Sequence, residues 1–278
     1  MNGRIGSLSA GTIAQFLLGN ESAIRAVASS SAAIWTGIAL TMLTAFARSY
    51  DQTFILANPL LWLFGPLAFS LVSGTFLFRL TYGIGARGTM AHTPDSRPAL
   101  WKHWRGFMGA FWLTAPIAWL YALPVERFFD SLTSTKINIG LLAVVALWRV
   151  LLMARVLQVV CQAPFRRTLL WVLGASFAEV LLVGFFGGAF GKSLMASMGG
   201  MRNSPEEDLL LNAFGFVATV SFWGIPVVVL LLAVWRWPGP ASEWPGLHPA
   251  AINWKPIVAA AVFWIGITIP AQLELRHN

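Results

Sequence analysis

Residues 139–161 read IGLLAVVALWRVLLMARVLQVVC, and residues 168–188 read TLLWVLGASFAEVLLVGFFGG. Each stretch is predominantly apolar and exceeds the roughly 20 residues that an α-helix needs to cross the hydrocarbon core of a bilayer. Only a short turn around Pro164 and Phe165 separates them. The two stretches therefore predict an antiparallel pair of membrane-spanning helices.

The composition extends this interpretation to the whole chain. Of the 278 residues, 57% are hydrophobic and 11% are charged, and the mean hydropathy is +0.68. Soluble domains carry roughly 25% charged residues. The sequence therefore predicts an all-α, polytopic transmembrane bundle that forms a single domain over residues 1–278, with membrane lipid as its main partner. The net charge of +8 is assigned to loops that set membrane topology and not to nucleic-acid binding.

Seven apolar segments are predicted to span the membrane. They are residues 31–47, 54–78, 107–123, 139–161, 168–188, 209–235 and 256–273. The last segment is the weakest, so six spans are the alternative. Pro66, Pro116 and Pro226 lie inside three of these segments and predict kinks or breaks.

The remaining segments are predicted to lie at the membrane surface. Residues 1–30 form an N-terminal cytoplasmic or interfacial segment, in which residues 12–18 make a short amphipathic piece and Asn20 caps the helix that follows. Residues 79–106, rich in Gly, Pro and basic side chains, are predicted as the main cytoplasmic loop. The sequence Ser-Pro-Glu-Glu at 204–207 is a capping box and predicts a helix start.

The distribution of basic residues predicts the orientation. With the N-terminus in the cytoplasm, 12 basic residues fall on the cytoplasmic side and six fall outside. The positive-inside rule therefore favours a cytoplasmic N-terminus, with the C-terminus outside. The inferred location is the inner membrane of a bacterium.

Two ionisable residues, Arg149 and Glu179, lie near the centres of neighbouring spans. Charges at that depth cost several kcal/mol unless they are paired or hydrated, so both are expected to face the bundle interior. Counted from the turn between the spans, Arg149 is about 15.5 residues away and Glu179 about 14.5, so they lie at nearly the same depth. We predict an intramembrane ion pair. Its role is either structural, fixing helix register, or functional, as part of a proton, ion or solute path.

Two further groups of residues are candidates for packing or surface contacts. Arg155, Gln158 and Gln162 form a polar stripe at the cytoplasmic end of the fourth span, interpreted as a face toward solvent or lipid headgroups. Gly184, Gly187, Gly188 and Gly191 are spaced as small residues that let a neighbouring helix approach closely. The run from Gly187 to Ser193 resembles a phosphate-binding loop, but it lacks the first glycine and a preceding strand.

No constellation for catalysis, metal binding or cofactor binding is evident. Cys161 is the single cysteine, and the four histidines lack ligand spacing. We therefore predict no catalytic residues, no cofactor and no metal.

Three stretches, at 47–51, 114–129 and 147–157, resemble a family of uncharacterised multi-span membrane proteins of bacteria. That resemblance implies a helical membrane fold but brings no functional residues with it. The general layout is also similar to that of Yip1-type membrane proteins, although the Asp-Leu-Tyr-Gly-Pro signature of that family is missing here.

These observations order three hypotheses for function. A non-enzymatic structural, assembly or accessory subunit of a membrane complex comes first, because many spans are joined by short loops without catalytic groups. A small-solute or ion transporter or channel that uses Arg149 and Glu179 is the alternative. An intramembrane enzyme comes third.

Overall fold

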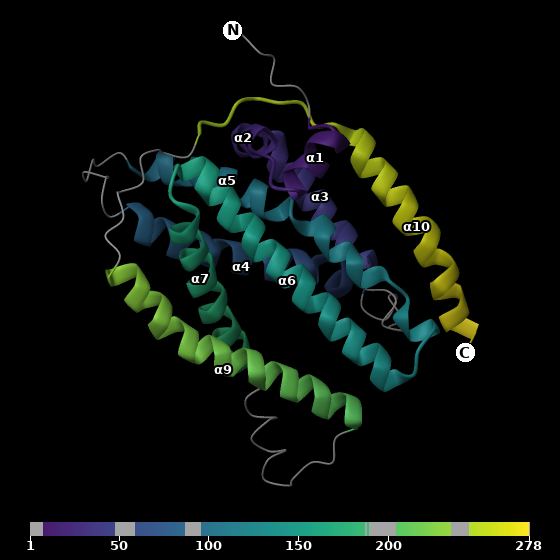
Figure 1. Cartoon of the computed structure of the whole chain (residues 1–278). Helices are drawn as coiled ribbons and strands as arrows, with labels where there is room; N and C mark the ends of the chain where they lie inside the picture. Colours follow the sequence, from purple (N-terminus) through teal and green to yellow (C-terminus); the bar gives the residue numbers. More distant parts are fainter. Residues whose placement is uncertain are drawn as a thin grey trace.

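The computed structural model describes residues 8–47, 59–86, 96–186, 188, 204–234 and 245–277. Within these ranges the secondary structure is helical, apart from one isolated β-bridge between Ser30 and His248. The predicted all-α fold is therefore confirmed (Figure 1).

The helices follow one another from a short pair at the N-terminus to a long helix at the C-terminus. Their bounds are α1 Ala10–Leu17, α2 Glu21–Ser29, α3 Ala32–Ala47, α4 Pro59–Ala86, α5 Ser96–Trp112, η3 Ala115–Ala122, η4 Val125–Arg127, α6 Ser131–Cys161, α7 Phe165–Phe186, α9 Pro205–Val234 and α10 Trp254–His277.

In the described part of the chain, five helical segments are long and apolar enough to cross a membrane. They are Leu63–Thr81, Leu100–Arg127, Ser131–Cys161, Phe165–Phe186 and Pro205–Val234. Two shorter apolar helices, Ala32–Phe46 and Trp254–Ile269, coincide with the predicted first and last spans. The chain is thus compatible with an integral membrane protein, and the exact count of seven spans stays a prediction.

The predicted loop at 79–106 is largely helical. α4 continues to Ala86 and α5 begins at Ser96. The Gly, Pro and basic residues that favour a loop from Arg79 do not end α4 at that point. A helix does not have to end there, since charged and polar residues are tolerated once it leaves the hydrocarbon core.

Proline interrupts one of the three predicted spans that contain it and leaves the other two continuous. α5 ends at Trp112, and after Leu113 and Thr114 the chain forms the 3₁₀ helix η3, so the third predicted span is broken. Pro116 explains the break, because its ring clashes with the carbonyl four residues earlier, at Trp112. Pro66 and Pro226 instead lie inside continuous helices, so neither α4 nor α9 is broken at its proline.

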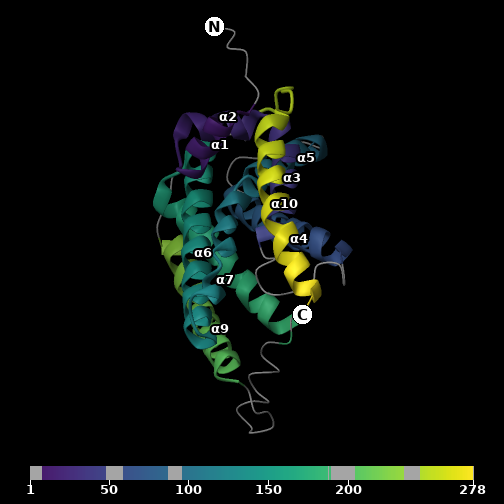
Figure 2. The ribbon, with the colours of Figure 1, turned by 90° about the vertical axis from the view of Figure 1, so that its right-hand side faces the viewer.

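The long helices α6 and α7 run in opposite directions, and α3 and α10 start at the same end (Figures 1 and 2). The start of α10 is held beside the start of α3 by two backbone hydrogen bonds, from Ser31 N–H to the His248 carbonyl at 3.0 Å and from His248 N–H to the Ser29 carbonyl at 2.7 Å. α6 and α7 form the predicted hairpin, in which Gln162 adopts a left-handed conformation with φ 51° at the C-cap of α6.

The short helices α1 and α2 lie across one end of the bundle (Figure 2). Asn20 caps α2 as predicted, since its Oδ1 accepts from the N–H groups of Ser22 and Ala23. Phe16 and Ile24 are fully buried in a core cluster shared with α3, α5 and α6. The N-terminal segment is therefore part of the core, and α1 does not simply rest on the membrane surface.

Glycines allow the helices on one side of the bundle to come close together. A Cβ added at Gly37 of α3 would lie 2.7 Å from the Trp112 Cβ, and one at Gly109 of α5 would lie 3.1 Å from the Ala33 Cβ. Gly74 of α4 faces Met108, and Gly224 of α9 packs directly on the Phe177 ring. Small-residue packing of this kind is the usual way in which membrane helices associate tightly.

Candidate intramembrane binding site

A cavity of about 630 Å³, open to the surface, lies among α4, α5, α6, α7 and α9. Its walls are mainly apolar. Five polar side chains line it: Ser70, Ser73, Arg149, Ser176 and Glu179. A volume of this size, with mostly apolar walls and a few polar groups, is typical of small-molecule sites.

The helical repeat brings Arg149 and Glu179 to the same cavity. The α6 residues that line it are 139, 142, 143, 146, 149, 150 and 153, and those of α7 are 172, 176, 179, 180 and 183, so one face of each helix lines the cavity. The short turn at Pro164 keeps the two helices side by side, and both charges therefore face inward from matching depth.

Arg149 is held in place by the break in the third span. Its Nε donates a hydrogen bond to the Thr114 Oγ1 at 3.1 Å, and its guanidinium carbon lies 5.1 Å from the centre of the Phe111 ring. Thr114 is fully buried, and its hydroxyl donates to the Phe111 carbonyl at 2.7 Å. The guanidinium is therefore oriented by a neutral hydroxyl and an aromatic face.

Glu179 is half-buried on the α7 side of the cavity and interacts electrostatically with Arg149. The hydrogen bond of Arg149 goes to Thr114, not to Glu179. The direct ion pair between Arg149 and Glu179 thus stays a prediction. The structure establishes that the guanidinium of Arg149 and the carboxyl group of Glu179 line the same cavity.

Thr114, Phe111 and the serines of the cavity were not found by sequence reasoning. The signal for Thr114 was present, because Pro116 predicts that α5 ends at Trp112 and a residue just after that end is free to present its side chain. No comparable signal marks Ser70, Ser73 or Ser176, since serine is common in membrane helices.

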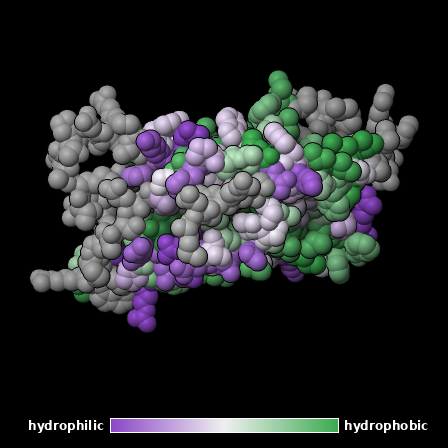
Figure 3. All heavy atoms as spheres, turned by 90° about the horizontal axis from the view of Figure 1, so that it is seen from above, coloured by the Kyte–Doolittle hydropathy of each residue, from purple (hydrophilic) through white to green (hydrophobic). Residues whose placement is uncertain are grey.

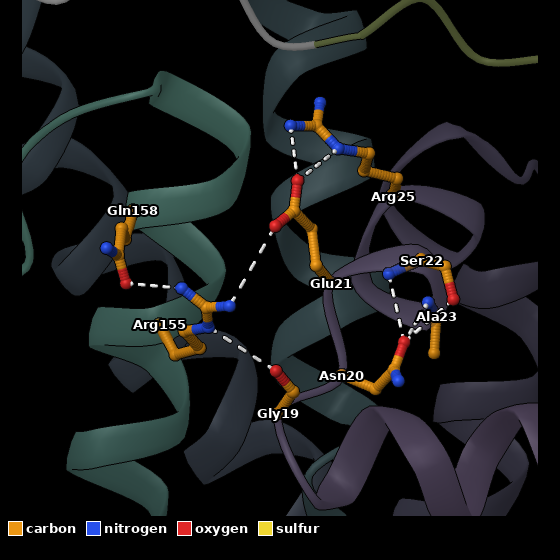
Figure 4. A network of polar contacts seen from close by, with 8 residues as sticks. All are labelled: Gly19, Asn20, Glu21, Ser22, Ala23, Arg25, Arg155 and Gln158. Atoms are coloured by element: carbon orange, nitrogen blue, oxygen red, sulfur yellow. Dashed lines mark hydrogen bonds and ion pairs between the residues drawn. The ribbon is translucent and has the colours of Figure 1, made fainter.

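The residues of the predicted polar stripe have different surroundings in the structure (Figure 4). Arg155 donates to the Gln158 Oε1 at 2.7 Å and to the Gly19 carbonyl at 3.4 Å, and its Nη2 lies 4.0 Å from the Glu21 carboxylate. Arg155 thus contacts the N-terminal segment, because the turn at Gly19 with φ 77° presents its carbonyl to α6, and the predicted face toward solvent or headgroups stays a prediction. Gln162 is exposed at the end of α6.

The predicted glycine packing face is only partly realised. Gly184 is buried in α7. Gly188 lies in a turn after the end of α7 with φ 72° and with open space where its Cβ would be, so it ends the helix and is not a packing position. Gly187 and Gly191 lie outside the described residues. The close approaches at Gly37, Gly109 and Gly224 were missed because glycines are frequent in all the spans.

The far end of the bundle carries a cluster of acidic side chains. Asp130 caps α6, since its carboxylate accepts from Thr133 N–H at 3.0 Å, and this hydrogen bond lowers the pKa of Asp130 below its usual value of 3.8. The Glu126 carboxylate accepts from the Asn138 side chain at 2.5 Å. Among the described residues, no group of three or more His, Cys, Asp or Glu side chains is arranged to hold a metal ion.

Comparison with known proteins gives no relative. No family model, no curated protein and no solved structure matches the chain. The resemblances to uncharacterised bacterial membrane proteins and to Yip1-type proteins therefore stay predictions, and the function has to be argued from the site.

Proposed function

We propose that this chain is a multi-span protein of a bacterial inner membrane that binds and transports a small amphipathic anion. The observation that carries the proposal is the cavity lined by both Arg149 and Glu179. This reverses the order of the hypotheses from sequence, because a purely structural pair of charges needs no space beside it, whereas a solute does.

The chemistry of the cavity favours an anion with an apolar body. Arg149 keeps its positive charge beside the neutral Thr114, and its hydrogen bond to Thr114 uses only Nε. A carboxylate, sulfonate or phosphate is the natural partner for a guanidinium. The apolar walls match a hydrocarbon body, and Glu179 adds a second polar group on the α7 wall.

The broken third span supports a transport function. Substrate sites of many membrane transporters lie beside interrupted helices near the bilayer centre, because the interruption provides polar backbone at a depth where lipid offers none. Here α5 ends at Trp112 and η3 begins at Ala115, and Thr114 between them accepts a hydrogen bond from Arg149.

The test is transport by the purified full-length chain in liposomes. Currents are recorded on a solid-supported membrane after concentration jumps of hexanesulfonate or phenyl phosphate, with hexyltrimethylammonium as the cationic control. We expect currents with the anions only, and a loss of at least tenfold in Arg149→Gln. Equal currents with anion and cation, or wild-type currents in Arg149→Gln, would overturn the proposal.

A second variant guards against misfolding of Arg149→Gln. Ala146 lines the cavity and is exposed, so Ala146→Phe fills the cavity without removing a charge. It is expected to abolish transport while leaving the yield of monodisperse protein unchanged. Val144→Phe, on an exposed face of the same helix outside the cavity lining, is the matched control and is expected to transport normally.

An accessory subunit remains the second candidate, and one feature of α9 favours it. Of the 30 residues of α9, those buried are Ala218, Ser221 and Val228, while Phe216, Phe222 and Trp223 are exposed. A partner helix would bury that surface. Purification in mild detergent tests this hypothesis: a stoichiometric partner that is lost in Phe222→Ala/Trp223→Ala would support it, and a chain that purifies alone would exclude it.

A further inference from the structure

The end of the bundle that carries α2 is markedly basic. Arg79 of α4, Lys102 and Arg105 of α5 and Arg166 of α7 form what we call the basic collar. Seen from above, hydrophilic side chains gather on one part of the surface, and hydrophobic ones dominate the side where α10 lies (Figure 3). The acidic residues Asp130, Glu206 and Glu207 belong to the starts of α6 and α9, at the opposite end.

Helix packing brings the collar residues to one level. α4 and α5 are antiparallel, with the Trp104 indole N–H donating to the Thr75 hydroxyl at 3.2 Å and the Phe78 and Phe107 rings 5.5 Å apart. Arg79 follows Phe78, and Arg105 follows Trp104. At the start of α7, Phe165 and Leu169 pack on the same core cluster as Leu80 and Trp104, which places Arg166 nearby.

Tryptophans mark this level as a membrane–water boundary. The Trp101 and Trp104 rings are stacked, with centroids 4.6 Å apart and planes 13° apart, and Trp101 is 57% exposed. Indole rings favour the depth of the lipid headgroups. The basic collar therefore lies where phospholipid phosphates lie.

The protein offers the collar no counter-ion among the residues that the structure describes around it. Neither α4 nor α5 contains an aspartate or glutamate. Glu21, the acidic residue of α2, is engaged by Arg25 at 2.9 Å and by Arg155 at 4.0 Å. Arg79, Lys102 and Arg166 are exposed.

We propose that the basic collar binds the headgroup phosphate of an anionic phospholipid, whose acyl chains cover the apolar faces of α4 and α5. Basic clusters between membrane helices on the cytoplasmic side are suited to such headgroups. Lipid is the occupant, because the site combines phosphate chemistry with a boundary tryptophan pair and apolar helix faces directly beneath it. The site is separate from the Arg149 cavity and does not depend on it.

The experiment measures lipid binding to the full chain in neutral detergent by native mass spectrometry. The probes are phosphatidylglycerol, phosphatidylcholine with the same acyl chains, and inorganic phosphate. Phosphatidylglycerol is expected to bind at least tenfold more tightly than either of the others. Equal binding of both lipids, or equal binding of inorganic phosphate, would overturn the proposal.

Variants assign the binding to the collar. In Arg79→Gln/Lys102→Gln/Arg166→Gln each lost cation is expected to weaken phosphatidylglycerol binding by about fivefold, the equivalent of about 1 kcal/mol per basic residue. Arg127→Gln/Lys136→Gln at the opposite end is the control and is expected to change the affinity less than twofold. A similar loss in both variants would contradict the assignment.

A charge-conserving variant keeps the test decisive if the triple variant does not fold. Arg79→Lys/Arg105→Lys/Arg166→Lys is expected to hold phosphatidylglycerol within about threefold of the wild-type affinity. For the wild type, raising the salt concentration from 0.05 to 0.5 M is expected to weaken phosphatidylglycerol binding and to leave phosphatidylcholine binding unchanged, since salt screens exposed charges. Salt-independent binding would contradict an electrostatic site.

Discussion

Arg149 shows how one residue depends on its neighbours at membrane depth. A guanidinium among apolar helices is costly unless polar groups meet it. Here the Thr114 hydroxyl accepts from Nε, and the Phe111 ring offers its negative face. Thr114 is thus a positioning residue that sets where the charge of Arg149 lies in the cavity.

Replacing Thr114 tests this role. Thr114→Val keeps the shape but removes the acceptor, and we expect the free energy of unfolding to fall by about 2 kcal/mol, because a hydrogen bond to a charged group contributes about 1.5–3 kcal/mol. Thr114→Ser keeps the hydroxyl, and its free energy of unfolding is expected to stay near the wild-type value. The measurement is reversible unfolding in mixed micelles. Equal stability of the two variants would show that Arg149 does not rely on this hydroxyl.

Asp130 predicts a pH dependence at the start of α6. Thr133 N–H lowers the pKa of the Asp130 carboxyl in the folded chain, so its stabilisation is complete above the unfolded pKa and is lost as the pH falls through the folded pKa. We expect the wild type to unfold at a higher temperature than Asp130→Asn at pH 6, since only the carboxylate also favours the helix dipole.

This difference in unfolding temperature between wild type and Asp130→Asn should shrink as the pH falls below 3.8, the usual pKa of an aspartate. Contributions of carboxyl groups remote from Asp130 cancel in the comparison, whereas that of Glu206 does not, because the charge of Asp130 acts on it. A difference that stays constant from pH 6 to pH 2.5 would show that Asp130 does not titrate in this way.

At the scale of elements, close packing of α3 on α5 requires small residues. A Cβ at Gly37 would meet both the Trp112 Cβ at 2.7 Å and the Gly109 carbonyl at 3.3 Å, so neither neighbour has room to move aside. We expect Gly37→Ala to lower the free energy of unfolding by roughly 1–3 kcal/mol, the usual cost of overpacking.

Gly140 of α6 provides the matched control. Nothing lies within 4 Å of its added Cβ, so Gly140→Ala is expected to be neutral or slightly stabilising. Thermal unfolding of both variants in one detergent separates packing from helix propensity. Equal thermal unfolding midpoints of Gly37→Ala and Gly140→Ala would indicate that the α3–α5 contact is looser than the structure shows.

The N-terminal helices are held by burial more than by charge. The Arg155–Glu21 contact is long, and the two side chains are 36% and 54% exposed, so its contribution should stay below about 1 kcal/mol. Ile24 is fully buried in the shared core, and truncation of such a residue costs about 2–5 kcal/mol.

We therefore expect Ile24→Ala to destabilise the chain more than Arg155→Gln does. Limited proteolysis after residue 30, together with thermal unfolding, measures the two effects. If Arg155→Gln releases the segment and Ile24→Ala does not, the polar contacts would have to be the main attachment.

At the scale of the whole molecule, the two ends differ in charge. The end with α2 and the basic collar is positive, whereas the starts of α6 and α9 bring Asp130, Glu206 and Glu207 to the other end. The positive-inside rule then predicts that the α2 end faces the cytoplasm.

Single-cysteine labelling checks this orientation. In a Cys161→Ser background, Ser204→Cys, before α9, is expected to react with a membrane-impermeant maleimide on intact spheroplasts. Ser22→Cys, at the start of α2, is expected to react only after permeabilisation. The reverse pattern would invert the predicted topology, and labelling of both from outside would argue against a spanning fold.

Local sequence patterns predicted the all-α fold, the apolar helices, the α6–α7 hairpin and the caps at Asn20 and Ser204. These depend on local information, because hydrocarbon length and backbone hydrogen bonds restrict what each segment can form. The sequence also identified Arg149 and Glu179, since charges are rare at that depth.

Tertiary structure alone decided what those charges face. Thr114 is 35 residues from Arg149 along the chain, and the cavity is formed by five helices whose neighbours depend on which side chains interlock. The same applies to Gly37 on Trp112 and to Arg155 on Gly19. Packing partners depend on shape summed over many contacts, and the apolar pattern of a membrane helix is nearly uniform around its surface, so its sequence does not reveal which face meets which neighbour.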